Sequence, residues 1–257
     1  MLKYVLSLIF IICALHSYGQ GNSNSLKNEL IIRYDYSVLW TIDSIDLEFE
    51  NRVISRGEPL GYIGENYQRF FIHFISIIQN PHNRSEYHVY GKTRVKENIC
   101  SFQGVLSIDS LILYDRPLIE DITQGYLKGH YDFYEDPNQR GSGELSGNFR
   151  THFYIDRNDQ VKYDAIEIYA DGYDNNQFEG TWKSYASESI KKCNWGDFRI
   201  PDGFNLDIGA AEFSANENYA SNGWENFIIA SDICCNKNDP AVQKAYALEL
   251  EEWWKDD

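Results

Sequence analysis

The sequence predicts a mainly β protein, either an antiparallel up-and-down barrel or a strongly curved meander, with about eight to ten strands. The first reason is that apolar and polar residues alternate in short segments along most of residues 29–185, separated by polar turns. The second is a recurring unit, apolar-x-Gly-x-apolar, found at Phe102–Leu106, Leu127–Tyr131, Leu145–Phe149 and Phe178–Trp182. Glycine on the apolar face of a strand is typical of a sheet that curves tightly around its own core.

Residues 1–19 have the order of a secretory signal peptide. A short basic start is followed by an apolar run over residues 4–15, which is too short to span a bilayer, and by small residues before a cleavage site after Gly19. We expect no lipid anchor on Cys13, because Ile12 stands where a lipoprotein motif needs a small residue. The mature protein is therefore predicted to be secreted or periplasmic.

The rest of the chain divides into three parts. Residues 20–28 are predicted to be a flexible polar leader, and residues 29–185 the meander or barrel. Within the latter, the strictest alternation runs over residues 30–42 and predicts the first strand. Residues 186–257 are predicted to form a long loop segment and then one C-terminal helix, packed on the same domain.

The C-terminal helix has a clear start signal. Asp239 is a good N-cap residue, and Pro240 suits the first helical position. Val242, Tyr246 and Leu250 then fall on one face, with the apolar spacing of a helix that packs on a domain.

Charge excludes some partners. The formal net charge is −16, and a chain so acidic repels nucleic acid and anionic lipid. No apolar run after the signal peptide approaches the length of a membrane helix. We therefore predict no nucleic-acid partner and no membrane insertion.

Four cysteines follow the signal peptide: Cys100, Cys193, Cys234 and Cys235. Export permits disulfides, and four cysteines allow three pairings. We predict a Cys100–Cys193 disulfide, because both cysteines adjoin strands that carry the apolar-x-Gly-x-apolar unit. A covalent link there would hold the long loop against the barrel. No zinc-binding spacing is present in the sequence.

Three stretches carry a resemblance to known proteins. The start Cys100-x-Phe-x-Gly, the strand Phe-x-Gly-Thr-Trp ending at Trp182, and the segment Cys193–Pro201 resemble a group of uncharacterised secreted bacterial β-rich proteins. The resemblance covers roughly the C-terminal two-thirds of the mature chain and implies no activity. Gly180–Trp182 is also similar to the Gly-x-Trp of lipocalin-like barrels, where it opens the first strand; here it closes the meander and implies only a similar architecture.

The long loop is the expected place for function, because loops at a barrel mouth are where ligands bind. We expect non-enzymatic binding of a small molecule, glycan or protein partner there, with Trp182 in the core. The alternative is a glycan-active hydrolase, which needs two carboxylates flanking a sugar. The candidate ligand-binding residues are Trp195, Asp197, Arg199, Asp207, Glu212 and Trp224, and the hydrolase would use Asp197, Asp207 or Glu212.

Other chemistry has weaker support. The turns at residues 156–159 and 171–175 offer oxygen ligands for calcium, yet both also suit ordinary hairpin turns and lack the full calcium-loop pattern. His130 and His152 lack a third metal ligand, and no serine stands in a nucleophile elbow. No catalytic residue, metal site or cofactor is predicted.

Overall fold

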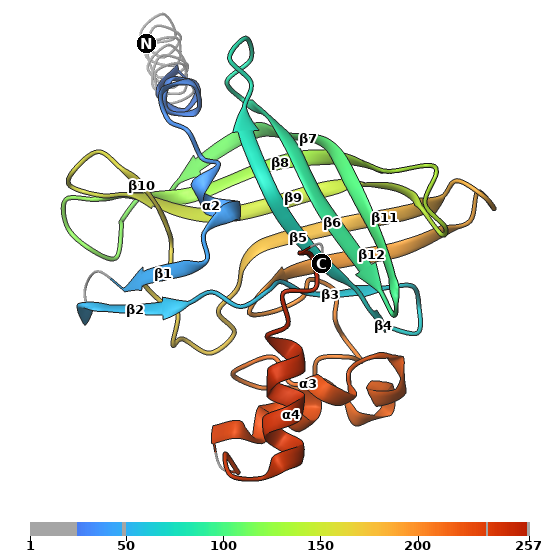
Figure 1. Cartoon of the computed structure of the whole chain (residues 1–257). Helices are drawn as coiled ribbons and strands as arrows, with labels where there is room; N and C mark the ends of the chain where they lie inside the picture. Colours follow the sequence, from blue (N-terminus) through green and yellow to red (C-terminus); the bar gives the residue numbers. More distant parts are fainter. Residues whose placement is uncertain (1–24, 48–49, 235, 256–257) are drawn as a thin grey trace, which may run out of the picture.

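The structure is a computed structural model that describes residues 25–47, 50–234 and 236–255. The predicted signal peptide, residues 1–19, lies outside the described residues, as does the first part of the predicted leader. A ten-stranded antiparallel sheet curls into a half-barrel, and short helices gather beside it toward the C-terminus (Figure 1). The predicted mainly β fold with a strongly curved antiparallel meander is thereby confirmed.

The elements have the following bounds. The strands are β1 (Ser44–Leu47), β2 (Arg52–Ser55), β3 (Leu60–Ile63), β4 (Gln68–Arg69), β5 (Phe71–Gln79), β6 (Glu86–Val95), β7 (Asn98–Leu113), β8 (Thr123–Glu135), β9 (Gly143–Ile155), β10 (Val161–Tyr163), β11 (Asn175–Ser184) and β12 (Ile190–Asp197). The α-helices are residues 25–33, α2 (Val38–Thr41), α3 (Glu225–Ala230) and α4 (Pro240–Glu249). Two 3₁₀ helices span Glu217–Asn222 and Ser231–Cys234.

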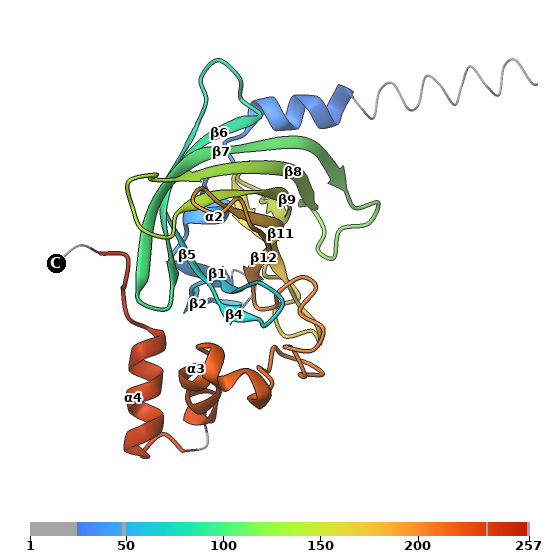
Figure 2. The same cartoon turned by 90° about the vertical axis from the view of Figure 1, so that its right-hand side faces the viewer.

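The strand order explains the curl. The main sheet runs β4-β3-β12-β11-β9-β8-β7-β6-β5, and β10 pairs with β9 outside this path. Its first and last strands, β4 and β5, are consecutive in the chain with only Phe70 between them, so the two ends of the sheet meet there. The Phe70 N–H donates to the Gly61 carbonyl of β3 at 2.9 Å. Figure 2 shows the resulting curl, with β5 and β12 on opposite sides.

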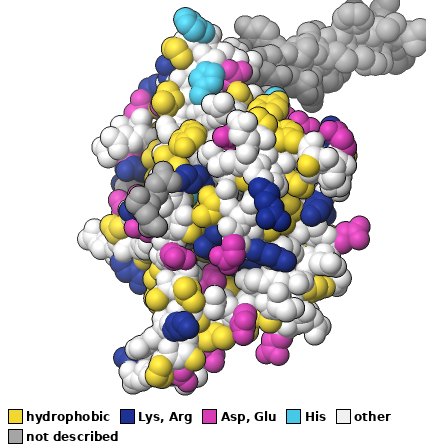
Figure 3. Space-filling view, turned by 45° about the vertical axis from the view of Figure 1, so that its right-hand side comes forward, with side chains coloured by type: hydrophobic (Ala, Val, Ile, Leu, Met, Phe, Trp, Pro, Cys, Tyr) yellow, Lys and Arg dark blue, Asp and Glu magenta, His cyan; other side chains and the backbone are white. Residues whose placement is uncertain are grey.

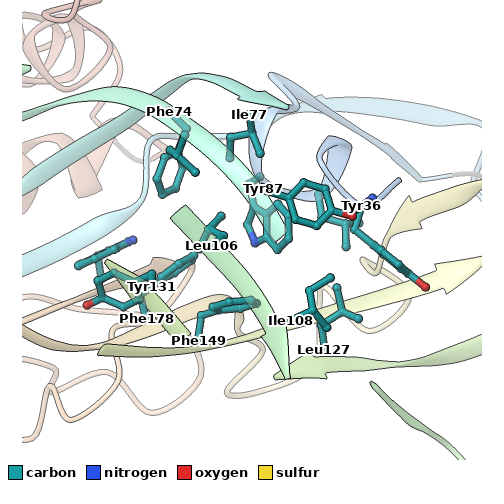
Figure 4. Close-up of a cluster of buried hydrophobic side chains, with 14 of the residues drawn as sticks. Tyr36, Phe74, Ile77, Tyr87, Leu106, Ile108, Leu127, Tyr131, Phe149 and Phe178 are labelled. Carbon is teal, nitrogen blue, oxygen red and sulfur yellow. Dashed lines mark hydrogen bonds between the residues drawn. The ribbon is translucent and has the colours of Figure 1, made fainter. Parts of the chain in front are cut away.

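Aromatic rings fill the inside of the curl. Phe178 of β11 stacks on Trp195 of β12 with ring centroids 5.0 Å apart, and Phe149 of β9 lies 5.6 Å from Phe178. Figure 4 shows the side chains of Tyr131, Phe149 and Phe178 close together in this cluster. Burying rings of this size is the main source of stability in such a core.

The glycines of the recurring unit make room for these rings. A Cβ atom at Gly129 would overlap the Ser107 carbonyl and the ring of Phe149, and one at Gly180 would overlap the Ser146 carbonyl and the hydroxyl of Tyr131. The predicted position of these glycines on the apolar, curved face is therefore correct.

The strand predicted over residues 30–42 is wrong. Residues 25–33 form a helix, which includes the described part of the predicted leader, and α2 follows. Tyr36, Leu39 and Trp40 are fully buried, and this i, i+3, i+4 spacing also suits a helix. The Trp40 indole N–H donates to Thr151 Oγ1 of β9 at 2.9 Å, so α2 packs into the open side of the half-barrel.

The loop predicted to begin at residue 186 contains the last strand of the meander. β12 pairs with β11 on one side and with β3 on the other. The residues after β12 cover the outer face of β3, where Tyr62, Leu206 and Trp224 belong to a second buried cluster. α4 starts as predicted: Pro240 is at its first turn and the Asp239 side chain accepts from the Ala241 N–H.

The predicted disulfide is not formed, because Cys100 and Cys193 are both free, buried thiols. Cys100 is on β7 and Cys193 on β12, and strands β8, β9 and β11 lie between them in the sheet. A disulfide needs Cα atoms about 4.4–6.8 Å apart. Because neighbouring strands in a sheet are already about 4.8 Å apart, two cysteines with three strands between them are too far from each other to bond.

Candidate functional site

A hollow of about 1250 Å³ opens at one end of the half-barrel. Four hairpin turns surround it, namely β3–β4, β6–β7, β8–β9 and β11–β12, on the right-hand side of Figure 1. We call it the hairpin-end hollow. Its lining residues are Ile63, Gly64, Glu65, Asn66, Gln68, Phe70, Thr93, Val95, Lys96, Glu97, Asn98, Glu135, Arg140, Gly141, Trp182, Ile190, Lys191, Lys192 and Asn222.

A buried carboxylate, Glu135, stands at the inner end of this hollow and is only 4% exposed. Its Oε2 accepts from the Gly143 N–H of β9 at 2.8 Å and from the Trp182 indole N–H of β11 at 3.0 Å. Its Oε1 accepts from the hydroxyl of Thr93 on β6. Because Glu135 ends β8, one side chain connects four strands of the sheet.

Glu135 has neutral donors around it, and no ion pair involving it is found among the described residues. Burial raises the pKa of Glu135, and the hydrogen bonds from Thr93, Trp182 and Gly143 only partly oppose that rise. Nearby, burial and the charge of Glu135 raise the pKa of Cys100 to about 11. At the inner end of the hollow, burial therefore raises the pKa of both groups.

Beyond Glu135 the half-barrel is filled by side chains. Phe133 lies two residues deeper on β8, and its ring stacks on Phe102 with centroids 5.0 Å apart. Tyr131 follows, 5.1 Å from the ring of Trp195, and all four rings are at most 1% exposed. The hairpin-end hollow is thus a shallow basin above a packed core.

The rim of the hollow carries basic residues. Lys96, Arg140 and Lys191 are exposed, and none has a carboxylate partner among the described residues, whereas Lys192 pairs with Asp202 at 2.6 Å. The Lys191 ammonium lies 5.6 Å from the centre of the Trp182 ring. Figure 3 brings this side forward and shows Lys and Arg side chains (dark blue) grouped over the middle of the face, with Asp and Glu among them.

Sequence reasoning assigned the two tryptophans the wrong way round. Trp195, expected in a loop, is fully buried on β12 and packs against Phe178. Trp182, expected in the core, is only partly buried and lines the hairpin-end hollow. One face of its indole covers Gly143, where an added Cβ would lie 2.7 Å from the ring.

Asp197 is at the opposite end of β12 and serves as an anchor for α2. It forms a bidentate ion pair with Arg56, at 2.9 and 3.0 Å, and accepts from Tyr163 and Asn176 at 2.8 Å. The same arginine donates to the carbonyl of Trp40 in α2. These contacts occupy both carboxylate oxygens of Asp197, which is only 3% exposed.

The other four predicted site residues lie in the segment after β12. Arg199 pairs with Asp207, and it donates to the carbonyls of Gly209 and Ala210. Glu212 is exposed.

Trp224 is fully buried on the outer side of β3, with its indole N–H donating to the Tyr67 carbonyl at 2.7 Å. The structure therefore does not bring the six predicted residues into one site.

Glu135 was missed, although the sequence carries a signal for it. Leu127, Gly129, Tyr131 and Phe133 alternate on the inner face of β8, and Glu135 continues that phase. A carboxylate in the apolar phase of a strand is a buried ionisable group, which is uncommon unless it is well partnered.

The weaker candidates have local partners. Asp156 accepts from the N–H groups of Asn158 and Gln160 in its own turn, and Asp174 pairs with Arg150. His152 contacts the hydroxyl of Tyr114 at 2.7 Å. Across the described ranges there is no cluster of three or more His, Cys, Asp or Glu residues suited to a metal ion, and no described helix has the length and apolar character to cross a bilayer.

Comparisons of the chain with protein-family models, with curated proteins and with solved structures find no match.

Proposed function

We propose that this protein binds a small organic ligand in the hairpin-end hollow and performs no chemistry on it. The observation that carries the proposal is the hollow itself, about 1250 Å³ and lined by an indole ring, amide side chains and a buried carboxylate. Ligand sites are concave, of roughly 300–1000 Å³, and combine apolar surface with a few placed polar groups. The predicted signal peptide supports a secreted or periplasmic location for this binding.

The site differs from the one expected from sequence, which was the long loop. That segment packs on the outer wall of β3 and holds a smaller hollow of about 410 Å³, whereas the hollow between the hairpin turns measures about 1250 Å³.

A glycan-active hydrolase has less support. Asp197 pairs with Arg56 under α2, whereas Asp207 pairs with Arg199 in the segment after β12. Carboxylates that work as an acid and base pair must flank one substrate, about 5–10 Å apart, with room for it between them. Glu212 is exposed, and none of these three carboxylates lines the hairpin-end hollow.

A thermal-shift screen of residues 20–257 tests the proposal. The panel contains neutral and acidic oligosaccharides, fatty acids, aromatic carboxylates and calcium. A ligand present at a hundred times its Kd should add about 2.7 kcal/mol and raise Tm by about 5–10 °C.

A matched pair of variants locates the binding. Asn66 is exposed on the β3–β4 turn at the mouth of the hollow, so Asn66→Trp should crowd it and abolish the shift. Asn205 is exposed in the segment after β12, and Asn205→Trp should keep the shift. If the panel gives no shift, or if Asn66→Trp responds like the parent, binding in the hollow is wrong.

A further inference from the structure

We infer that the ligand of the hairpin-end hollow is an acidic oligosaccharide, that is, a hydroxylated chain of sugar rings bearing carboxylates. This inference rests on the proposed binding function and specifies the class of ligand. Three features of the hollow support it: its shape, its hydrogen-bonding groups and the charge of its rim.

Shape argues against a lipid. A fatty acid or other long alkyl chain needs a deep apolar channel to leave water. In this protein the space behind Glu135 is occupied by Phe102 and Phe133, whose stacked rings are 1% and 0% exposed. The hollow is therefore wide and shallow, and its volume of about 1250 Å³ suits several sugar rings lying along the turns.

The polar groups of the lining suit hydroxyl groups. Gln68 donates its amide to the Asn222 carbonyl at 2.7 Å, and Asn98 donates its amide to the sulfur of Cys100 at 3.3 Å. Among the described residues no donor reaches Gln68 Oε1 or Asn98 Oδ1, so both oxygens remain to accept from ligand hydroxyls. The Trp182 indole adds apolar surface to the lining, and the Lys191 ammonium lies 5.6 Å from the centre of its ring, so a sugar ring packed there would contact both side chains.

The rim supplies the preference for an acid. Lys96 and Arg140 lie in the β6–β7 and β8–β9 turns, Lys191 lies at the start of β12, and the three side chains line the same opening. Elsewhere, the buried arginines Arg56 and Arg69 are matched by carboxylates. Three cations without such partners can instead pair with carboxylates spaced along a bound chain.

Three carboxylates also line the hollow, and they set the limit of this preference. Glu65 and Glu97 are exposed on the outer turns, as the three rim cations are, and water screens charges of both signs there. Glu135 is buried, bonded to neutral donors, and has a raised pKa. At the rim, the three exposed cations Lys96, Arg140 and Lys191 face two exposed carboxylates, while Asp202 pairs with the fourth basic side chain of the lining, Lys192. The attraction for an anion comes from this surplus of one cation.

Isothermal titration calorimetry at low salt tests the ligand class. The probes are an oligosaccharide of uronic acids, a neutral oligosaccharide of equal length, a fatty acid and inorganic sulfate. We expect the uronic-acid oligomer to bind at least tenfold more tightly than the neutral one, and this preference to fall as salt increases. Sulfate should compete weakly, because it offers charge without sugar rings.

Charge-neutral variants locate the effect. Lys96→Gln, Arg140→Gln and Lys191→Gln should each weaken binding of the acidic oligomer by about fivefold, whereas Lys244→Gln on α4 should not change it. Tighter binding of the neutral oligomer or the fatty acid, still blocked by Asn66→Trp, would overturn the acidic class and leave hollow binding intact. No binding by any probe would overturn both, and equal loss in Lys244→Gln would overturn the role of the rim.

Discussion

Replacing Trp195 with alanine should destabilise the fold much more than replacing Trp182, although sequence reasoning expects the reverse. Trp195 is 0% exposed, and its ring lies 5.0 Å from Phe178 and 5.1 Å from Tyr131. Burying roughly 200 Å² of ring surface at about 25 cal/mol per Å² contributes about 5 kcal/mol. Its indole N–H has no hydrogen-bond partner in the described structure, and removing that buried donor returns about 1 kcal/mol or more. The net loss should be about 3–5 kcal/mol, a large share of ordinary domain stability.

Trp182→Ala provides the comparison. Trp182 is partly buried and donates one hydrogen bond to Glu135, so its loss should cost about 2 kcal/mol. Trp195→Phe keeps a ring and removes the unpartnered N–H, and should cost less than about 1.5 kcal/mol. Urea unfolding followed by far-UV circular dichroism measures all three, because that signal does not depend on the number of tryptophans. A Trp195→Ala loss below that of Trp182→Ala would refute this assignment of the core.

Three further expectations concern the pKa of Glu135, the buried thiols of Cys100 and Cys193, and the packing at Gly180 in β11. Because the pKa of Glu135 is raised in the folded state, the parent should lose stability relative to Glu135→Gln as pH rises above about 4.3. Urea unfolding at pH 4 and pH 7 measures the difference in unfolding free energy between the two proteins. The same difference at both pH values would contradict this expectation. Cys100 and Cys193 should resist iodoacetamide in the native protein and carry no mutual disulfide on peptide mapping, since both thiols are buried with raised pKa values. Gly180→Val should cost about 1–3 kcal/mol or more in unfolding free energy, because its Cβ would overlap the Ser146 carbonyl.

The strands that could be found from sequence are those with one face in the core and one in water. Along β8, the inward residues Leu127, Tyr131 and Phe133 alternate with exposed Lys128 and His130. This contrast is what a period-two pattern records, so the amino-acid sequence alone is enough to recognise β7, β8, β9 and β11.

The elements that were missed lack that contrast. Residues 193–197 of β12 are all buried, since the inner face packs on the core and the outer face is covered by the segment after the strand. A strand buried on both faces shows no alternation, and its Asn, Gly and Asp residues then resemble a loop. Conversely, residues 30–42 alternate by composition, yet residues 30–33 and 38–41 are helical, because tertiary packing of Tyr36 and Trp40 outweighs a local pattern.

The candidate site could not be predicted for a related reason. The hairpin-end hollow joins four turns that are far apart in the chain, and none of them carries a motif alone. Only the strand pairing brings Thr93, Glu135, Gly143 and Trp182 together.

The position of β3 in the sheet imposes an order on assembly. β3 is made early in synthesis and pairs with β4 directly after it, but its other partner, β12, ends at Asp197, so Ile63 must wait for Cys193 to complete its pairing. Strands β6 to β9 pair with their neighbours along the chain and need no such wait. Refolding should therefore protect the amides of β6–β9 from hydrogen exchange before those that pair β3 with β12, and a chain cut before β12 should leave that edge of β3 unpaired.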